Sequence, residues 1–222
     1  MATGQLTLPE ELMLLSLHRE TGKKRIDAQT LHLILAGAVL VELALEGAIE
    51  IHDDHVQASG TASDTAYPTH LLRISDEHKP RRAQWWVEHF QNRSQAEDLC
   101  RRLVHKGILK ETDSTVLGFI HVHRFPESEH DADAEIRSRL QRALAGTETG
   151  GAAPGPDDRT TALIALAEAG DLLRKIIPDA PKGRVNQIVA GPWQSPSARA
   201  AVEAVAAAVS TALVVVYMGG GS

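Results

Sequence analysis

Histidine pairs are the residues of this chain whose type and spacing come closest to a chemical site. His52 and His55 flank two aspartates, and His121 and His123 lie two apart, which places both side chains on one face of a strand and suits zinc or copper. Neither pair has a third ligand nearby in the sequence, and eleven histidines make such pairs common by chance. We therefore expect no metal site and no cofactor.

Nucleophilic chemistry has as little support. Cys100 is the single cysteine and falls on an apolar helix face between Leu99 and Leu103, which is typical of a buried, inert thiol. The chain contains no G-x-S-x-G, no P-loop, no G-x-G-x-x-G and no H-E-x-x-H. We predict no catalytic residues and a protein that is not an enzyme.

Composition limits the partners further. The formal net charge of -6 over 222 residues argues against general attraction to nucleic acid or anionic lipid, so any anion site must be local. One cysteine fits a reducing compartment, and the first residues lack a basic region followed by an apolar stretch, so we expect a cytoplasmic protein. The length suits one domain, predicted over residues 1–218, with a flexible tail over 219–222.

The elements that would position a site are mostly helices. Thr7, Pro9 and Glu10 mark a helix start, and residues 31–45 are apolar on nearly every side, which predicts a helix central to the core. That segment is shorter than the roughly 20 residues that cross a bilayer, and Glu42 interrupts it. Five further helices are expected. Two cover residues 133–144 and 159–177, and the other three begin at Pro80, at Ser94 and near Ser197. A mobile loop is expected over 146–158.

The hydrophobic period changes from helical to alternating after Gly107, which predicts a β-hairpin with arms over 108–111 and 116–125 and a turn at Asp113 and Ser114. Its second arm has apolar side chains on both faces: Leu117, Phe119 and Ile120. The predicted fold is mainly α, a single helical domain around a hydrophobic central helix with a projecting β-hairpin.

A helix followed by a hairpin is also typical of a winged-helix DNA-binding unit. Arg93, Arg101 and Arg102 partly supply the basic face that such a unit needs, but Glu97 and Asp98 occupy the first turn, where bases would be contacted. We keep a DNA-binding regulator as one alternative, and a cytosolic protein-binding scaffold as another.

Several stretches in order resemble the Golgi phosphoprotein 3 (GPP34) family. The matching stretches are LTLPEELMLLSL at 6–17, GAVLVELALEG at 37–47, WVE at 86–88, LVHKGIL at 103–109 and DRTTALIALA at 158–167. The second block is close to the family pattern G-x-x-L-x-E-L-A-L-x-G and is the most specific. The departures from the family elsewhere, with alanine-rich helices, suggest a divergent and bacterial branch.

The resemblance implies a peripheral membrane adaptor. Family members bind phosphatidylinositol 4-phosphate in a shallow basic pocket on the cytosolic face of the Golgi, insert an apolar hairpin tip into the bilayer, and bind cytoplasmic tails of glycosyltransferases. The pocket positions of the family, a Trp and three Arg, fall here on Asp27, Ala36, Arg93 and Ala96, so Arg93 alone keeps its type.

Other bases have to complete a headgroup pocket around Arg93, and the candidates are Arg25, Arg81 and Arg82, with Lys24 beside them. Leu117, Phe119 and Ile120 are the residues expected to enter the membrane. The expected partners are an anionic, phosphoinositide-like lipid and cytoplasmic tails of membrane enzymes, with no nucleic acid; a homo-oligomer is left open. The expected location is the cytosolic face of a membrane, the Golgi in a eukaryote or the plasma membrane in a bacterium.

Overall fold

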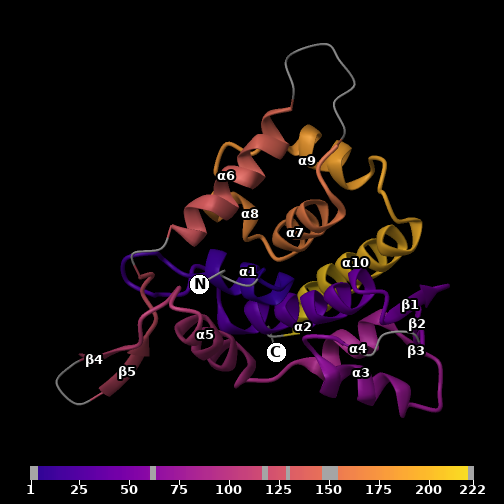
Figure 1. Cartoon of the computed structure of the whole chain (residues 1–222), viewed down its shortest axis with the longest axis horizontal. Coiled ribbons are helices and arrows are strands. Elements are labelled where there is room, and N and C mark those ends of the chain that lie inside the picture. Colours follow the sequence, from indigo (N-terminus) through magenta and orange to yellow (C-terminus); the bar gives the residue numbers. More distant parts are fainter. Residues whose placement is uncertain (1–4, 61–63, 117–119, 129–130, 147–154, 220–222) are drawn as a thin grey trace.

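The computed structural model describes residues 5–60, 64–116, 120–128, 131–146 and 155–219 (Figure 1). Within them the helices are α1 (Leu8–Leu15), α2 (Ala28–Leu45), α3 (Pro68–Ser75), α4 (Ala83–Phe90), α5 (Gln95–His105), α6 (Ala132–Ala145), α7 (Asp158–Ala169), α8 (Leu173–Ile176), α9 (Lys182–Val189) and α10 (Pro196–Gly219). The strands are β1 (Ile49–His52), β2 (His55–Ala58), β3 (Arg81–Arg82), β4 (Thr112–Val116) and β5 (Ile120–Arg124). The mainly helical fold with a hairpin confirms the predicted class.

Helix α2 is the centre of the fold, as its apolar sequence predicts. The Asp27 carboxylate caps it by accepting from the Thr30 backbone N–H, and α1, α4, α7 and α10 pack around it. Within the described residues α2 is the one helix long and apolar enough to cross a membrane, with 18 residues, and 72% of it is buried inside the protein. Its apolarity is accounted for by these neighbours, because a helix that is apolar on all sides belongs in a core.

Gly37 sets the distance between α2 and α10. A Cβ built at this position would lie 2.9 Å from Cγ2 of Val209 and 3.0 Å from Cγ1 of Val205. Glycine therefore lets the two helices approach closely at this point, where α10 packs against α2.

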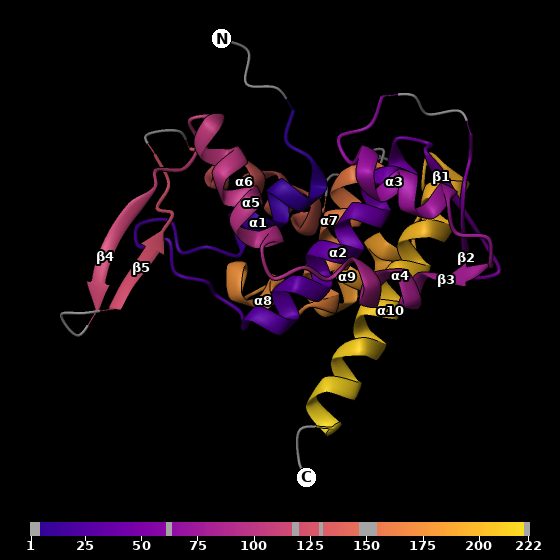
Figure 2. The same cartoon turned by 90° about the horizontal axis from the view of Figure 1, so that it is seen from below.

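The two sheets lie at opposite ends of the molecule. Strands β1, β2 and β3 form one antiparallel sheet, in which Asp53 and Asp54 make the first turn with positive φ angles. Strands β4 and β5 form the other, a hairpin that projects from the body beside α5 (Figure 2). Arg81 and Arg82, which form β3, therefore lie far from the hairpin (Figures 1 and 2).

The hairpin register differs from the prediction. The predicted turn at Asp113 and Ser114 is wrong, because both residues belong to β4 and pair with His123 and Val122. The described ladder ends where Val116 pairs with Ile120. Leu117 and Phe119 lie outside the described residues, whereas the Ile120 backbone belongs to β5.

The predicted helix over 159–177 is broken in two. A Cβ at Gly170 would lie 2.4 Å from Cγ2 of Ile34 on α2, and Asp171 has a φ of 54°, so the chain turns between α7 and α8. Helix α9 was not predicted. Much of the predicted loop over 146–158 lies outside the described residues, as do the last three residues of the predicted tail, whose first residue is in α10.

Candidate functional site

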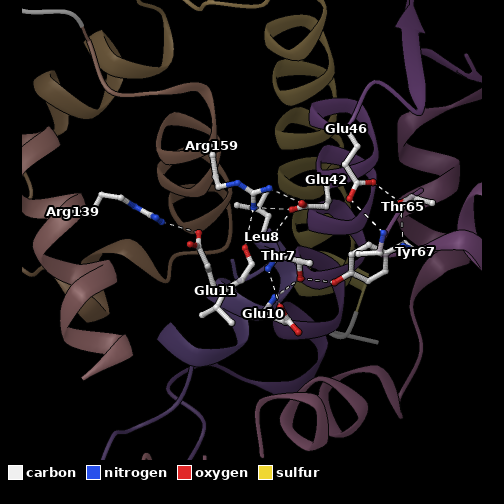
Figure 3. A network of polar contacts seen from close by, with 12 residues as sticks. Thr7, Leu8, Glu10, Glu11, Glu42, Glu46, Thr65, Tyr67, Arg139 and Arg159 are labelled. Atoms are coloured by element: carbon white, nitrogen blue, oxygen red, sulfur yellow. Dashed lines mark hydrogen bonds and ion pairs between the residues drawn. The ribbon is translucent and has the colours of Figure 1, made fainter. Parts of the chain in front are cut away.

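A buried polar network joins α1, α2 and α7 (Figure 3). The Glu42 carboxylate is 3% exposed and accepts from Arg159 at 2.6 and 3.0 Å and from the Leu8 backbone N–H at 2.6 Å. Burial lowers the pKa of Arg159, but the hydrogen bonds and charge of Glu42 more than offset this, and the net shift is upward. Arg159 thus stays charged, and the pair fixes the start of α1 against α2 and α7.

The same network continues along α1. Thr7 caps the helix in a capping box with Glu10, whose carboxylate also accepts from Lys106 at 2.7 Å. Glu11 accepts from Arg139 of α6 at 2.8 Å (Figure 3), and burial raises the pKa of Glu11 although Arg139 acts in the opposite direction. These carboxylates are paired with cations and hold helices together.

A pocket of about 450 Å³ lies between the end of α1, the start of α5 and the base of the hairpin. Its apolar side is formed by Met13, Leu17, Cys100 and Phe125, and its charged and polar side by Lys23, Lys24, Arg93, Glu97, His123 and Arg124. The cations come from three separate parts of the chain: the loop after α1, the residue before the cap of α5, and the last residue of β5.

Gly22 brings these parts together. A Cβ at Gly22 would lie 2.5 Å from the backbone of Phe125, and its φ of 61° favours glycine, so the loop after α1 packs directly against the base of the hairpin. A β-bridge between Leu17 and Lys24 closes this loop. Lys23 and Lys24 are therefore held beside the end of β5.

The pocket is locally cationic in an acidic chain. Lys23, Lys24 and Arg93 are exposed and make no side-chain ion pair with any described residue, whereas Glu97 is paired with Arg101 at 2.6 Å. The pKa of His32 is lowered by partial burial and then by the charges of Lys24 and Arg93, which places these cations in one electrostatic neighbourhood. An arrangement of this kind can hold an anion through charge-assisted hydrogen bonds.

Cys100, at the apolar side, fits the inert thiol expected from the sequence. It is buried, and this burial raises the pKa of the thiol to about 12, an effect that the charge of Lys24 only partly offsets.

The residues predicted for headgroup binding do not all meet here. Arg93 lines the pocket, but Arg25 lines a separate one and donates to the Leu17 carbonyl at 2.9 Å. At the opposite end of the molecule, the guanidinium of Arg81 lies 4.5 Å from the Trp85 ring centroid, and Arg82 lies 3.9 Å from the Asp54 carboxylate.

Two pocket cations were not among the predicted ligands. Lys23 belongs to the basic run after Gly22, which is the signal that could have identified it, whereas nothing in the sequence around Arg124 indicates that it reaches the pocket. Of the positions matched to the family pocket, Arg93 and Ala96 lie here, Asp27 lines the other pocket and Ala36 is fully buried.

Three histidines of the two pairs have other partners. His52 contacts Glu50 at 2.9 Å, the His55 ring bonds the Asp53 carbonyl at 2.9 Å, and His123 lies 3.5 Å from Glu111. Over the part of the chain that the structure describes, no group of three or more His, Cys, Asp or Glu side chains is placed to hold a metal ion.

The fold defines a helical domain built on one buried central helix, with a hairpin projecting beside a cationic pocket. The model of the Golgi phosphoprotein 3 (GPP34) family matches residues 8–205, and the chain belongs to this family. The stretches that carried the resemblance supply Glu10, Glu42, Lys106 and Arg159, which meet in or beside the buried network.

Proposed function

We propose that the protein is a non-enzymatic, peripheral membrane adaptor that binds the phosphomonoester headgroup of a phosphoinositide of the phosphatidylinositol 4-phosphate type. The observation that carries this proposal is the pocket beside the hairpin, where Lys23, Lys24 and Arg93 have no ion-pair partner among the described residues. Family membership supports the same function.

The pocket offers what a phosphomonoester needs. Such a group carries about 1.5 to 2 negative charges and three acceptor oxygens, so it favours several charge-assisted donors over one. Three exposed cations, each contributing about 1 kcal/mol near an anionic surface, give a moderate affinity. This local charge is compatible with a net charge of -6, because attraction at the pocket does not require a basic protein.

The hairpin supplies the apolar part of the contact in this proposal. His123 and Arg124 at the end of β5 line the pocket, so a headgroup bound there lies at the base of the hairpin. Leu117, Phe119 and Ile120 follow β4 or begin β5, and we propose that they enter the acyl region. The site would then face the cytosolic leaflet, of the Golgi in a eukaryote or of the plasma membrane in a bacterium, where cytoplasmic tails of membrane enzymes are within reach.

Vesicle co-sedimentation tests the headgroup site. The vesicles contain phosphatidylcholine alone, with phosphatidylserine, or with phosphatidylinositol 4-phosphate. We expect the last to bind best, with Arg93→Ala about fivefold weaker and the double variant Lys24→Ala/Arg93→Ala about 30-fold weaker, from about 1 kcal/mol for each cation. Arg82→Ala is the control, because it removes the same charge at the other end of the molecule and should leave binding unchanged.

Three outcomes would contradict the proposal. Absence of binding to any vesicle refutes membrane association, and an equal loss in Arg82→Ala and Arg93→Ala refutes the pocket. Unchanged binding in Phe119→Asp refutes the role of the hairpin.

Inorganic phosphate in competition separates a site for the free anion from one that needs the lipid. A salt-dependent gel shift with DNA would favour the winged-helix alternative. Binding to neither vesicles nor DNA would leave a cytosolic protein-binding scaffold as the remaining alternative.

A further inference from the structure

One carboxylate lies among the cations of the pocket beside the hairpin. Glu97 of α5 is the one acidic residue among the described residues that line this pocket. Its side chain is 44% exposed, so the carboxylate can meet a ligand that enters the pocket. The proposed headgroup site makes no use of it, because a negative charge opposes the binding of an anion. Its presence in the lining therefore needs an explanation of its own.

The position of this carboxylate is fixed by its own helix. Glu97 is in the first turn of α5 and accepts from the Arg101 guanidinium at 2.6 Å, one turn further along. Arg101 does not line the pocket, so Glu97 is the nearer of the two charges to a bound ligand. Asp98, the next residue, accepts from the Ser94 hydroxyl and does not line the pocket either. Both carboxylates suit a helix start, but of the two Glu97 is the one that a ligand would meet.

The charge of Glu97 acts in the same place as that of Lys24. Both influence the thiol of Cys100, on the apolar side of the pocket. Burial raises the pKa of this thiol most, Lys24 lowers it, and Glu97 and Glu111 raise it further. A bound anion would therefore meet attraction and repulsion within one small volume.

The balance of charge suits one phosphomonoester group. Lys23, Lys24 and Arg93 make no ion pair with a described residue, and three cations less the one carboxylate leave two positive charges. Arg124 also lines the pocket but is not free. A phosphomonoester carries about 1.5 to 2 negative charges, so one such group uses the available positive charge. A second group on the same headgroup would be repelled by Glu97 without a further free cation to offset the repulsion.

Volume does not make this selection. The pocket, at about 450 Å³, falls within the range of about 300–1,000 Å³ that small-molecule sites occupy. Rejection of a similar ligand is commonly achieved by placing a like charge against it. A carboxylate in the lining of a cationic pocket is an arrangement of this kind.

We propose that Glu97 is a specificity-determining residue of this pocket, which favours headgroups with one phosphomonoester group over headgroups with two. This inference rests on the proposed function, because it assumes that the pocket binds a phosphorylated headgroup. An acidic residue at a helix start also stabilises the helix, and with that role alone Glu97 would not distinguish between ligands. The ratio of the affinities for the two headgroups separates the two roles, because helix stability does not change this ratio.

Co-sedimentation of the full chain with two sets of vesicles tests the proposal. One set contains phosphatidylinositol 4-phosphate and the other phosphatidylinositol 4,5-bisphosphate, each in phosphatidylcholine and adjusted with phosphatidylserine to the same total charge. We expect the unchanged protein to bind the first set more tightly. Glu97→Gln should change the ratio of the two affinities about fivefold in favour of the bisphosphate, for about two charges repelled by one at roughly 8 Å in water. Glu97→Lys should change the ratio further in the same direction.

Glu203→Gln is the matched control. It removes the same charge from the same kind of exposed pair, with Arg199 one turn away on α10, and it does not line the pocket. This variant should leave the ratio as it is in the unchanged protein. Far-UV circular dichroism checks that all variants fold.

The outcomes separate this inference from the proposed function. If the unchanged protein binds neither set of vesicles, both are wrong. If it binds and Glu97→Gln leaves the ratio unchanged, or if Glu203→Gln changes the ratio as much, only the inference is overturned. Tighter binding of the unchanged protein to the bisphosphate at equal vesicle charge also overturns it, and leaves the headgroup site in place.

Discussion

Replacing Arg159 by Met would leave the Glu42 carboxylate buried without its cation. Of the three hydrogen bonds that Glu42 accepts from described residues, two come from Arg159 and one from the Leu8 N–H. The side chain of Glu42 is 3% exposed and that of Arg159 is 21% exposed, so little water reaches the pair. Removing one partner of a buried pair costs about 3–5 kcal/mol. For a chain of this size we expect the melting temperature to fall by about 6–20 °C.

The double variant Glu42→Met/Arg159→Met tests whether this cost comes from the stranded charge. Replacing both partners of a buried pair by apolar residues is often neutral or stabilising. Here the Leu8 N–H would lose its acceptor, at a cost of about 1–3 kcal/mol. The double variant should therefore be less stable than the unchanged protein and more stable than Arg159→Met alone.

Urea unfolding followed by circular dichroism gives the free energies of unfolding. The control is Arg199→Met, which breaks an exposed pair with Glu203 one turn away on α10 and should cost no more than about 0.5 kcal/mol. The reasoning fails if Arg159→Met loses less than about 1 kcal/mol, or if the double variant is less stable than the single one.

Two further predictions concern the interior. Burial raises the pKa of Glu11 above its usual 4.5, although Arg139 is near. The folded chain therefore binds the carboxyl proton of Glu11 more tightly than the unfolded chain does. The stability that this carboxyl group contributes falls as pH rises through the interval above 4.5. Urea midpoints across that interval should lose this slope in Glu11→Gln; an unchanged slope assigns it to other groups. Gly37→Leu should lower the urea midpoint by overpacking against Val205 and Val209, at a cost of about 1–3 kcal/mol, and an unchanged midpoint would contradict the close approach of α2 and α10.

Local sequence signals were enough for the centre of the fold. The capping pair Thr7 and Glu10 and the apolar run ending at Leu45 identify α1 and α2, because capping and burial on all sides are properties of a few adjacent residues. The change of period after Gly107 likewise predicts a hairpin. Its register could not be predicted, since Asp113 and Ser114 are typical turn residues that here belong to a strand.

Features that depend on distant contacts were missed. At Gly170 the close approach of Ile34, more than a hundred residues away in the chain, leaves no room for a Cβ. Helix α9 begins after Pro181 with Lys-Gly-Arg, and its buried side chains, Val185 and Ile188, are too few for a clear helical period. In both places packing against the rest of the protein determines the structure.

The candidate site also combines residues that local sequence signals identify with residues that only distant contacts bring together. Arg93 could be identified by its position before the LVHKGIL block, because neighbouring residues fix that position. Lys23 and Arg124 reach the pocket only because Gly22 lets the loop after α1 touch the backbone of Phe125. Counting along matched blocks therefore predicts a pocket with one cation, whereas the folded chain brings others to it from the loop and the hairpin.

The residues that identify the family and those that would bind a lipid are different sets. Glu10, Glu42 and Arg159 belong to matched stretches and are paired in the interior, so a match to them reports that α1, α2 and α7 are held in the family arrangement. Lys23 and Lys24 lie outside those stretches and are exposed. Changes at these two lysines would leave the fold and the family match intact while altering the charge of the pocket. Lipid specificity in this chain therefore has to be measured at the pocket, because its lysines and Arg93 lie outside the matched stretches, which contribute the apolar Met13 and Leu17 to its lining.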